Sequence, residues 1–385
     1  MARHQTYDVI VVGAGVFGAW TAYFLRKSGA SVLLLDAYGP ANARASSGGE
    51  SRIIRMGYGA DEIYTRWSVN ALPLWKRLFA EAGRPELFQQ TGVLWIADEN
   101  DQNAFDTVST LQKTGTRFEK LSLSRLRERY PQIHFEDDCW GILEPESGVL
   151  MARRAVQTVV EQAAKISAHY ENAFVRPPAG TERLQHLVTN AGETLSAATF
   201  VFACGSWLGK VFPETLGGRI FPSRQEVFFF GVPPGDRRFA PPEMPTWLKV
   251  RDEFYGMPDI EDRGFKIAHD RHGVRVDPDT QSRVASADAA AIAREYVARR
   301  FPALRDAPIV ETRVCQYENT SNGDFLIDRH PHLENVWLVG GGSGHGFKHG
   351  PSLGEYLAAR VTQGGPVEPR FSLATKQVVQ KRAVF

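Results

Sequence analysis

The stretch TYDVIVVGAGVFGAWTAYFLRKSGASVLLLD, residues 6–36, reads as a strand, a tight turn, a helix and a second strand. Residues 8–12 form an apolar run of strand length, and residues 13–18 form a GxGxxG element directly after it. A strand that enters a helix through this element is typical of the βαβ units that bind dinucleotides. The stretch therefore predicts an α/β fold with a Rossmann-like domain.

Three glycines have separate roles in this turn. Gly13 permits the tight turn, Gly15 lets the backbone approach a pyrophosphate, and Gly18 lets the helix pack closely on the strand. GxGxxG alone is a weak signal, because glycines often serve packing. Here the strand, helix and terminal acid all stand where the motif requires them, and this context predicts a dinucleotide site.

The helix that follows is expected to begin near Val16 and Phe17, whose free N–H groups would face the phosphates. Asp36 ends the second strand, where an acidic residue accepts hydrogen bonds from a ribose and disfavours the 2′-phosphate of NADP. The motif does not separate NAD from FAD. Its place near the start of the chain favours FAD.

Composition excludes several other classes. The formal net charge is +1, so neither nucleic acid nor an anionic membrane is expected as a partner. The three cysteines are too scattered for a disulfide framework or a metal site, so we predict no metal and reduced thiols in a cytoplasm. The apolar run 9–25 is interrupted by glycines and followed by a second strand, which favours a buried unit over a secretory signal.

Periodicity predicts the remaining elements. Residues 61–83 have helical spacing, with Pro73 expected to kink or split the helix. Further helices are predicted at 102–113, 151–170, 287–300 and 351–361, and strands at 88–97, 199–204, 221–232 and 335–342.

A second glycine cluster lies near the C-terminus. Residues 315–317 read CQY, residues 324–328 read DFLID, and residues 340–348 read GGGSGHGFK. Glycines between a strand and a helix let backbone N–H groups reach an anion or a polar ring edge. This return to a glycine-rich strand suggests one nucleotide domain built from separated segments.

Together these segments resemble the monomeric sarcosine oxidase and N-methyltryptophan oxidase branch of the D-amino-acid-oxidase-like flavoproteins. The resemblance is carried, in order along nearly the whole chain, by VIVVGAGVFG (9–18), SRIIRMGYG (51–59), FYGMPDIEDRGFKIA (254–268), VRVDPDT (274–280), CQY and GHGFK. It is highly specific for the family and less so for the substrate.

The resemblance implies a fold of the GR2 flavoprotein type. The FAD-binding domain would be discontinuous, and a second α+β substrate domain would be built on a largely antiparallel sheet. The expected FAD-binding segments are 1–85, 150–220 and 310–385; those of the substrate domain are 86–149 and 221–309.

The resemblance also assigns roles around the cofactor. Cys315 matches the cysteine that forms a thioether to the flavin, a link that needs a thiolate and hence a nearby positive group. Lys266 matches the lysine beside the flavin that promotes the reaction with oxygen, where positive charge favours electron transfer. Arg52 matches the arginine that sits over the flavin. The further residues implied in FAD binding are Ser46, Gly342, Gly344, His345, Gly346, Phe347 and Lys348.

Arg55 and Lys348 match the pair that binds the substrate carboxylate. Arginine can grip a carboxylate with two N–H groups, and lysine adds a point charge. Tyr255 and Tyr317 match active-site tyrosines that orient the substrate. Taken alone, each cation could be in a surface salt bridge and each tyrosine in a core.

Two segments depart from the pattern of the family, and both are expected to lie near the substrate. Relatives carry a histidine four residues beyond the lysine that matches Lys266, whereas here Asp270 stands at that place and His269 comes one residue early. The loop 46–49 reads SSGG and lacks the histidines of sarcosine oxidases. The sequence therefore predicts an FAD-dependent oxidase of a secondary amine carboxylate that releases hydrogen peroxide, without selecting sarcosine.

Several alternatives stay open. The same fold would serve a dehydrogenase that ignores O₂ or a non-catalytic flavoprotein subunit. N-methyl aromatic, cyclic and fructosyl amino acids all remain as substrates, and a monomer is expected. Met257, Trp247 and residues 228–230 are candidates for the side-chain pocket.

Overall fold

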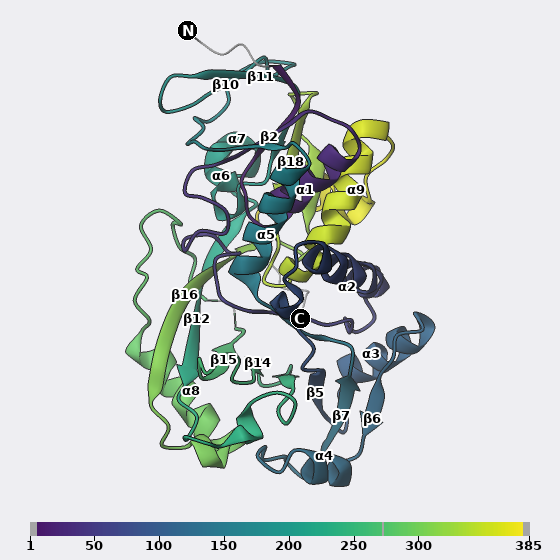
Figure 1. The fold of residues 1–385 in the computed structure, drawn as a ribbon, viewed down its shortest axis with the longest axis vertical. Helices are drawn as coiled ribbons and strands as arrows, with labels where there is room; N and C mark the ends of the chain where they lie inside the picture. Colours follow the sequence, from purple (N-terminus) through teal and green to yellow (C-terminus); the bar gives the residue numbers. More distant parts are fainter. Residues whose placement is uncertain (1–5, 272, 380–385) are drawn as a thin grey trace.

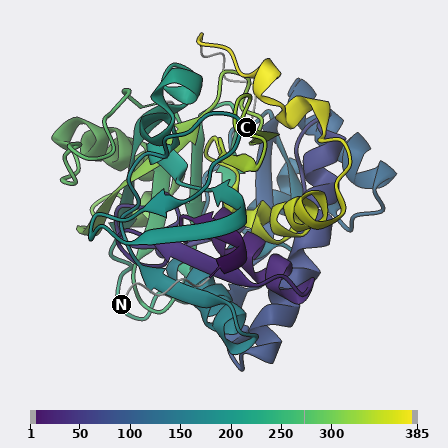
Figure 2. The ribbon, with the colours of Figure 1, turned by 90° about the horizontal axis from the view of Figure 1, so that it is seen from above.

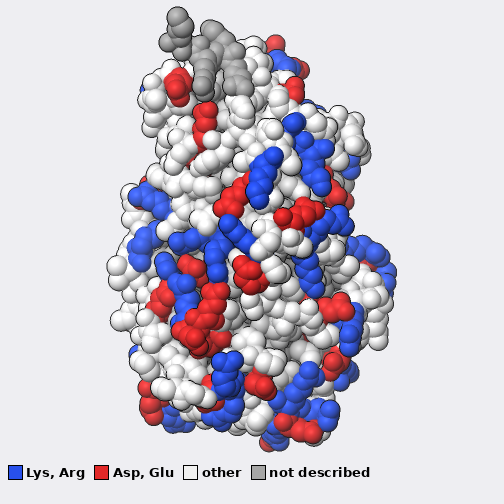
Figure 3. All heavy atoms as spheres, viewed as in Figure 1, with Lys and Arg blue, Asp and Glu red and all other residues white. Residues whose placement is uncertain are grey.

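The structure, a computed structural model, describes residues 6–271 and 273–379. Two large sheets lie in the upper and lower halves of an elongated molecule, and helix α2 lies where the halves meet (Figure 1). Basic and acidic side chains are interleaved over the face shown in Figure 3. Among the described helices, none is both long and apolar enough to cross a membrane.

The upper sheet is the predicted nucleotide-binding sheet, in the order β17-β18-β11-β1-β2-β9. Its strands from β18 to β9 are parallel, and β17 is an antiparallel edge strand. The strands are β1 (Thr6–Val12), β2 (Val32–Asp36), β9 (His169–Asn172), β11 (Thr194–Phe202), β17 (Leu326–Arg329) and β18 (Val336–Gly340), with β10 (Leu187–Val188) paired to β11.

Both faces of this sheet are covered, which explains why its strands read as continuous apolar runs. Val9 and Val11 of β1 pack into one core, whereas Ile10 and Val12 pack into another. On the first side, α1 (Val16–Lys27) packs against α5 (Ala152–Lys165) and α9 (Gly350–Gln363), as the view from above shows (Figure 2).

The lower sheet has eight strands in the order β16-β12-β15-β14-β13-β5-β7-β6. Neighbouring strands are antiparallel except β5 and β13, so the predicted largely antiparallel sheet is confirmed. The strands are β5 (Val93–Asp98), β6 (Glu119–Leu121), β7 (Cys139–Glu144), β12 (Phe221–Phe230), β13 (Thr246–Lys249), β14 (Phe254–Met257), β15 (Phe265–His269) and β16 (Ile309–Asn319).

A small third sheet connects the two halves. It comprises β3 (Arg52–Ile54), β8 (Gly148–Leu150) and β4 (Phe88–Gln89). The other helices are α2 (Glu62–Glu81), α3 (Gln102–Lys113), α4 (Leu123–Arg129), α6 (Leu208–Val211), α7 (Pro213–Leu216) and α8 (Ala287–Arg300). Short 3₁₀ turns are η1 (Pro85–Leu87), η2 (Gly205–Trp207), η3 (Arg237–Phe239), η4 (Pro302–Leu304), η5 (Phe347–His349), η6 (Pro369–Phe371) and η7 (Leu373–Thr375).

Three predicted elements differ in the structure. The helix predicted over 151–170 ends at Lys165, because Ser167 takes a left-handed backbone conformation, and β9 follows. The strand predicted over 88–97 is two strands, separated by a turn at Gly92 with φ +71°.

The third difference is α2, which runs through Pro73 as one helix and is not split. Proline removes the bond to the carbonyl four residues earlier, here that of Val69. Val69 lies on the exposed side of the helix, where water can bind that carbonyl.

The predicted domain boundaries stay a prediction.

Candidate active site

The turn after β1 is built around glycines that nothing larger can replace. Gly13 has φ +106°, and a Cβ on it would lie 2.3 Å from the carbonyl oxygen of Ala203. A Cβ on Gly18 would lie 1.8 Å from the carbonyl oxygen of Gly13. The two glycines therefore let β1, α1 and the end of β11 meet, as their spacing predicts.

The N-terminus of α1 is open. Gly15 is the N-cap and supplies no capping side chain, and the Val16 amide donates to Ser47 Oγ at 3.0 Å. The nearest atom to a Cβ on Gly15 would be the same Ser47 oxygen, at 3.4 Å. The backbone here is thus accessible from the neighbouring cavity, which is what an anion at a helix N-terminus needs.

Asp36 ends β2 at the same edge of the sheet. Its carboxylate accepts hydrogen bonds from the amides of Ala14 (2.8 Å), Tyr38 (2.8 Å) and Gly39 (3.0 Å). Burial raises the pKa of Asp36 above its usual value, although these bonds oppose the shift. Asp36 therefore anchors the turn and lines the cavity, where its remaining lone pairs are available to a ribose.

These residues line a cavity of about 280 Å³ that extends to the C-terminal glycine cluster. The predicted cofactor residues that line it are Gly13, Gly15, Val16, Phe17, Asp36, Ser46, Arg52, Gly342, Gly344, Gly346 and Phe347. Gly18 packs behind the turn. Cys315, His345 and Lys348 line the adjoining cavity described below.

Three buried polar atoms show that this cavity suits a ligand with hydrogen-bonding groups. They are Ser46 Oγ, Ser206 Oγ and Glu318 Oε2, which belong to lining residues and have no hydrogen-bond partner among the described residues. Buried polar groups are normally satisfied, so each has capacity for a bound group. The open helix terminus, the carboxylate of Asp36 and these three atoms fit the diphosphate, ribose and ribityl groups of FAD.

Glu318 is a lining residue that the sequence reasoning missed. Burial raises the pKa of its carboxyl group to about 7, and the amide of Gly342 donates to its other oxygen at 3.3 Å. The available signal was its position directly after the CQY motif, on a strand whose neighbouring residues were already assigned.

Cys315 and Tyr317 lie two residues apart on β16 and so share one face of the strand. Arg52 Nη2 is 3.4 Å from Cys315 Sγ, and the same nitrogen donates to the Ser46 carbonyl at 2.7 Å. The positive group that the predicted thioether link calls for therefore lies within contact distance of the thiol. The structure thus brings together the cysteine and the cation that the sequence predicted separately.

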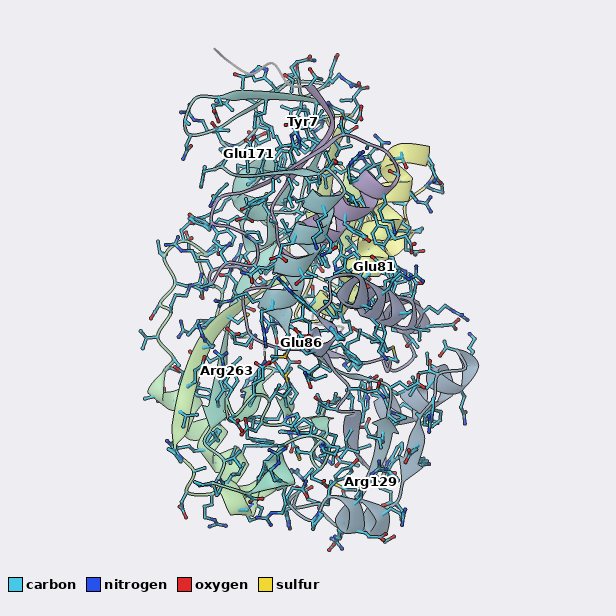
Figure 4. All side chains as sticks on the ribbon, viewed as in Figure 1. Tyr7, Glu81, Glu86, Arg129, Glu171 and Arg263 are labelled. Atoms are coloured by element: carbon cyan, nitrogen blue, oxygen red, sulfur yellow. The ribbon has the colours of Figure 1, made fainter. Side chains whose placement is uncertain are left out.

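Lys266 lies on β15, close to this pair but behind the walls of both cavities. Its ammonium donates to the carbonyl and hydroxyl oxygens of Ser51, at 2.9 and 3.0 Å. Burial, reinforced by Arg52, lowers the pKa of Lys266 to about 7. Arg263 contributes more weakly to lowering this pKa. It binds Glu311 beside the lower sheet (Figure 4).

A second cavity, of about 110 Å³, adjoins the first. The two share Arg52, Tyr317, Gly344 and Phe347 as lining residues. The shared wall includes Arg52 and Tyr317, which the sequence predicts to surround the flavin and the substrate, so the second cavity is the candidate substrate pocket. Arg55 and Lys348 both line it, as predicted for the carboxylate-binding pair.

Tyr58, which the sequence reasoning did not assign, lies against both cations. Lys348 Nζ donates to the Tyr58 hydroxyl at 2.6 Å, and the Arg55 guanidinium lies 4.3 Å from the centre of its ring. The Arg55 guanidinium also lies 4.7 Å from the ring of Trp95. Tyr58 falls within the quoted stretch SRIIRMGYG, so its position there was the available signal.

Glu144 anchors the backbone that carries Arg55. Its buried carboxylate accepts from the amides of Met56 (2.6 Å) and Gly57 (3.0 Å) and from Trp95 Nε1 (2.8 Å). Burial, reinforced by Arg55, holds the pKa of Lys348 well below its usual value. A bound carboxylate would oppose both effects and favour the charged lysine, so this end of the pocket suits an anion.

The wall of the pocket also carries tyrosines and an acid. Tyr317 donates its hydroxyl hydrogen to Asp270 Oδ1 at 2.8 Å. Burial raises the pKa of Tyr255 to about 12 and that of Tyr317 well above its usual value, so both hydroxyls stay neutral donors. His269 stacks on Phe254 with ring centres 4.5 Å apart and is not among the residues that line the pocket.

Part of the predicted side-chain pocket is wrong. Met257 lines the cavity, but Trp247, Phe228 and Phe230 pack into the core on the other face of the lower sheet. Strand alternation is the reason, because Leu248, next to Trp247, faces the cavity instead. Phe229 packs with Val227, and only Val227 reaches the cavity.

Fold and site together define an FAD-binding oxidoreductase, and the chain belongs to the FAD dependent oxidoreductase family, whose pattern it matches over residues 8–360. It is 31% identical to monomeric sarcosine oxidase of Bacillus sp. (strain NS-129), over 94% of each chain. It is 29% identical to N-methyl-L-tryptophan oxidase of Salmonella arizonae, over 91% of this chain and 94% of the relative.

A solved structure shares the fold as well. The L-proline dehydrogenase from P. horikoshii superposes with a TM-score of 0.84 at 19% identity, covering 96% of this chain and 97% of that one. The predicted family and fold are confirmed.

Proposed function

We propose that this protein oxidises a secondary α-amino acid, with an N-alkyl or cyclic amine, and transfers the electrons to O₂ as hydrogen peroxide. The observation that carries the proposal is the convergence of Arg55 and Lys348 on Tyr58, in a pocket that shares a wall with the cofactor cavity. The similarity to enzymes named for sarcosine and N-methyl-L-tryptophan supports the amine.

When bound, FAD supplies the two-electron acceptor for the C–N bond that is oxidised. The protein's own groups bind and orient the substrate. Arg55 and Lys348 hold the carboxylate, and Tyr255 and Tyr317 line the same pocket with neutral hydroxyls. Fixing one end of a small substrate in this way directs the α-carbon toward the shared wall.

The same proposal includes a covalent link between FAD and Cys315, which the adjacent guanidinium of Arg52 supports. It also assigns Lys266 to the oxygen step, as a buried cation close to Arg52 and Cys315. A cytoplasmic location and a monomeric state stay predictions from the sequence.

The test is a pair of substitutions in the carboxylate clamp. In Lys348→Met and Arg55→Met we expect KM for N-methyl amino acids to rise about a hundredfold, because a buried charged contact is lost. Initial rates of peroxide release under air measure this. Substrates from the N-methyl, cyclic and fructosyl amino acid classes are compared first with the wild-type protein.

Lys120→Met is the matched control. Lys120 also lies over an aromatic ring, 4.6 Å from the centre of Trp140, but it is exposed on β6. Its substitution should leave KM within about twofold, as is usual for exposed sites. An unchanged KM in both clamp variants would show that the substrate carboxylate binds elsewhere.

A further inference from the structure

The substrate pocket contains an acid as well as cations. Asp270 follows directly after β15, and its carboxylate accepts the hydrogen bond from Tyr317. Its backbone amide is held by the Glu253 carbonyl, which fixes the position of the residue. Asp270 lines the same cavity as Arg55 and Lys348.

Among the described residues that line this cavity, the acids are Asp270 and Glu253. The Glu253 side chain is 42% exposed and lies 3.8 Å from His269 Nε2, which places it at the rim. Asp270 is the inner acid, because its carboxylate contacts Tyr317 and its charge acts on Tyr255 and Lys348. Among the same described residues, four cations also line this cavity, Arg52, Arg55, Lys249 and Lys348, and Lys249 is paired with Asp98. Because Tyr317 belongs to the wall that the two cavities share, the Asp270 carboxylate that it contacts lies beside that wall.

An α-amino acid at neutral pH carries charges of both signs. Its carboxylate is negative, and the nitrogen of a secondary amine carries a positive charge. Removing that ammonium group from water is costly unless an acceptor or an anion pairs with it. A pocket lined by cations without an acid would select for anions and repel the ammonium group.

We propose that Asp270 binds the ammonium nitrogen of the substrate, so that the site takes secondary α-amino acids as zwitterions. This inference rests on the proposed function, because it requires the carboxylate to lie at Arg55 and Lys348. Tyr317 then has a positioning role, since its hydroxyl holds the Asp270 carboxylate from the side.

The test uses two ligands of the same shape. Trimethylammonioacetate carries a fixed positive charge, and 3,3-dimethylbutanoate has carbon in place of that nitrogen. The first has no nitrogen lone pair and the second has no nitrogen, so neither is a substrate, and calorimetric titration of the FAD-containing protein measures binding alone. We expect the wild-type protein to prefer the charged ligand by about tenfold or more.

In Asp270→Asn this preference should fall by about tenfold, because the charge is lost while the shape is kept. Asp306→Asn is the control, since it removes the same charge from an exposed turn. Tyr317→Phe should retain part of the preference, because the carboxylate remains but loses the hydroxyl that positions it. Asp270→Glu should also retain most of it, which separates loss of charge from damage to the fold.

An unchanged preference in Asp270→Asn, or equal affinity of the wild-type protein for both ligands, would overturn the role of Asp270. Lys348→Met should lower the affinity for both ligands by the same factor. If it weakens neither, or if neither ligand binds to the wild-type protein, the carboxylate clamp is wrong, and this inference falls with it.

Discussion

At the scale of single residues, Lys266 has the clearest pH signature. Its pKa of about 7 means that the ammonium is charged below that pH and loses its charge above it. A cation close to the flavin favours electron transfer to oxygen. We therefore expect the rate constant of the oxygen reaction to fall as pH rises through about 7, measured by stopped-flow mixing of the reduced protein with O₂.

In Lys266→Met this rate should be about a hundredfold lower, and its pH dependence in this range should disappear. Lys120→Met, outside the site, should keep the wild-type profile. A Lys266→Met protein that reacts as fast as the wild type would remove Lys266 from the oxygen step.

Lys266 also predicts a pH effect on stability. Its pKa is lowered in the folded state, from an ordinary value of 10.5 to about 7. Between these two values the unfolded chain binds more protons, so the free energy of unfolding should increase with pH in that window. Melting temperatures from pH 7 to 9.5 should rise less steeply in Lys266→Met, and an equal slope in both proteins would contradict the buried, neutral lysine.

The position of Cys315 predicts that FAD stays attached when the protein is denatured. Acid-precipitated wild-type protein should stay yellow, whereas Cys315→Ala should release its FAD, because only Cys315 lies beside the Arg52 guanidinium. Cys204→Ala is the matched control: Cys204 also lines the FAD cavity, but burial raises the pKa of its thiol and leaves it unreactive. Colour lost from both variants, or from neither, would contradict the link.

At the scale of elements, the junction of β1, α1 and β11 depends on Gly13. Gly13→Ala places a Cβ 2.3 Å from a backbone oxygen, and backbone atoms cannot move aside as a flexible side chain can. We expect loss of FAD binding and a fall in melting temperature well beyond that caused by backbone strain. Flavin content and thermal unfolding of the purified variants measure both.

Gly29→Ala separates the effect of backbone strain from the effect of a steric clash. Gly29 has φ +98°, close to the +106° of Gly13, but a Cβ there meets nothing within 4 Å. Its substitution should cost about 1–3 kcal/mol through the left-handed backbone alone and should keep FAD. Equal effects of the two substitutions would mean that close packing at Gly13 is not what the turn requires.

At the scale of the whole molecule, Arg370 connects distant parts of the chain. Its guanidinium binds Asp61, at the start of α2, and Asp324, before β17, which also accepts from the Tyr64 hydroxyl at 2.8 Å. Arg370→Met would leave Asp324, which is 5% exposed, without its cation. We expect a loss of about 1–3 kcal/mol, seen as a lower melting temperature.

Arg125→Met is the surface comparison, because Arg125 pairs with Glu128 and both side chains are about two-thirds exposed. Such pairs contribute about 0–1 kcal/mol, so this variant should melt close to the wild type. If both variants melt alike, the connection through Arg370 does not stabilise the molecule.

Local patterns were sufficient for much of the fold. The nucleotide-binding unit and most helices follow from apolar periodicity and glycine spacing, which act over a few residues. The largely antiparallel sheet was implied by the resemblance to the family. Errors arose where one backbone conformation decided the outcome, as at Ser167, where the predicted helix ends early. Pro73 was tolerated because the carbonyl it leaves unpaired lies on an exposed face.

By itself, the sequence determined the family, the cofactor class and which residue types would surround the flavin. Only the tertiary structure decided that Tyr58 lies between the two cations, that Asp270 rather than His269 enters the pocket, and that Trp247 faces away from it. The physical reason is that these positions depend on strand register and on contacts between segments up to 290 residues apart. Short-range patterns do not contain that information, because side chains alternate across a strand and one residue of offset reverses which of them face the site.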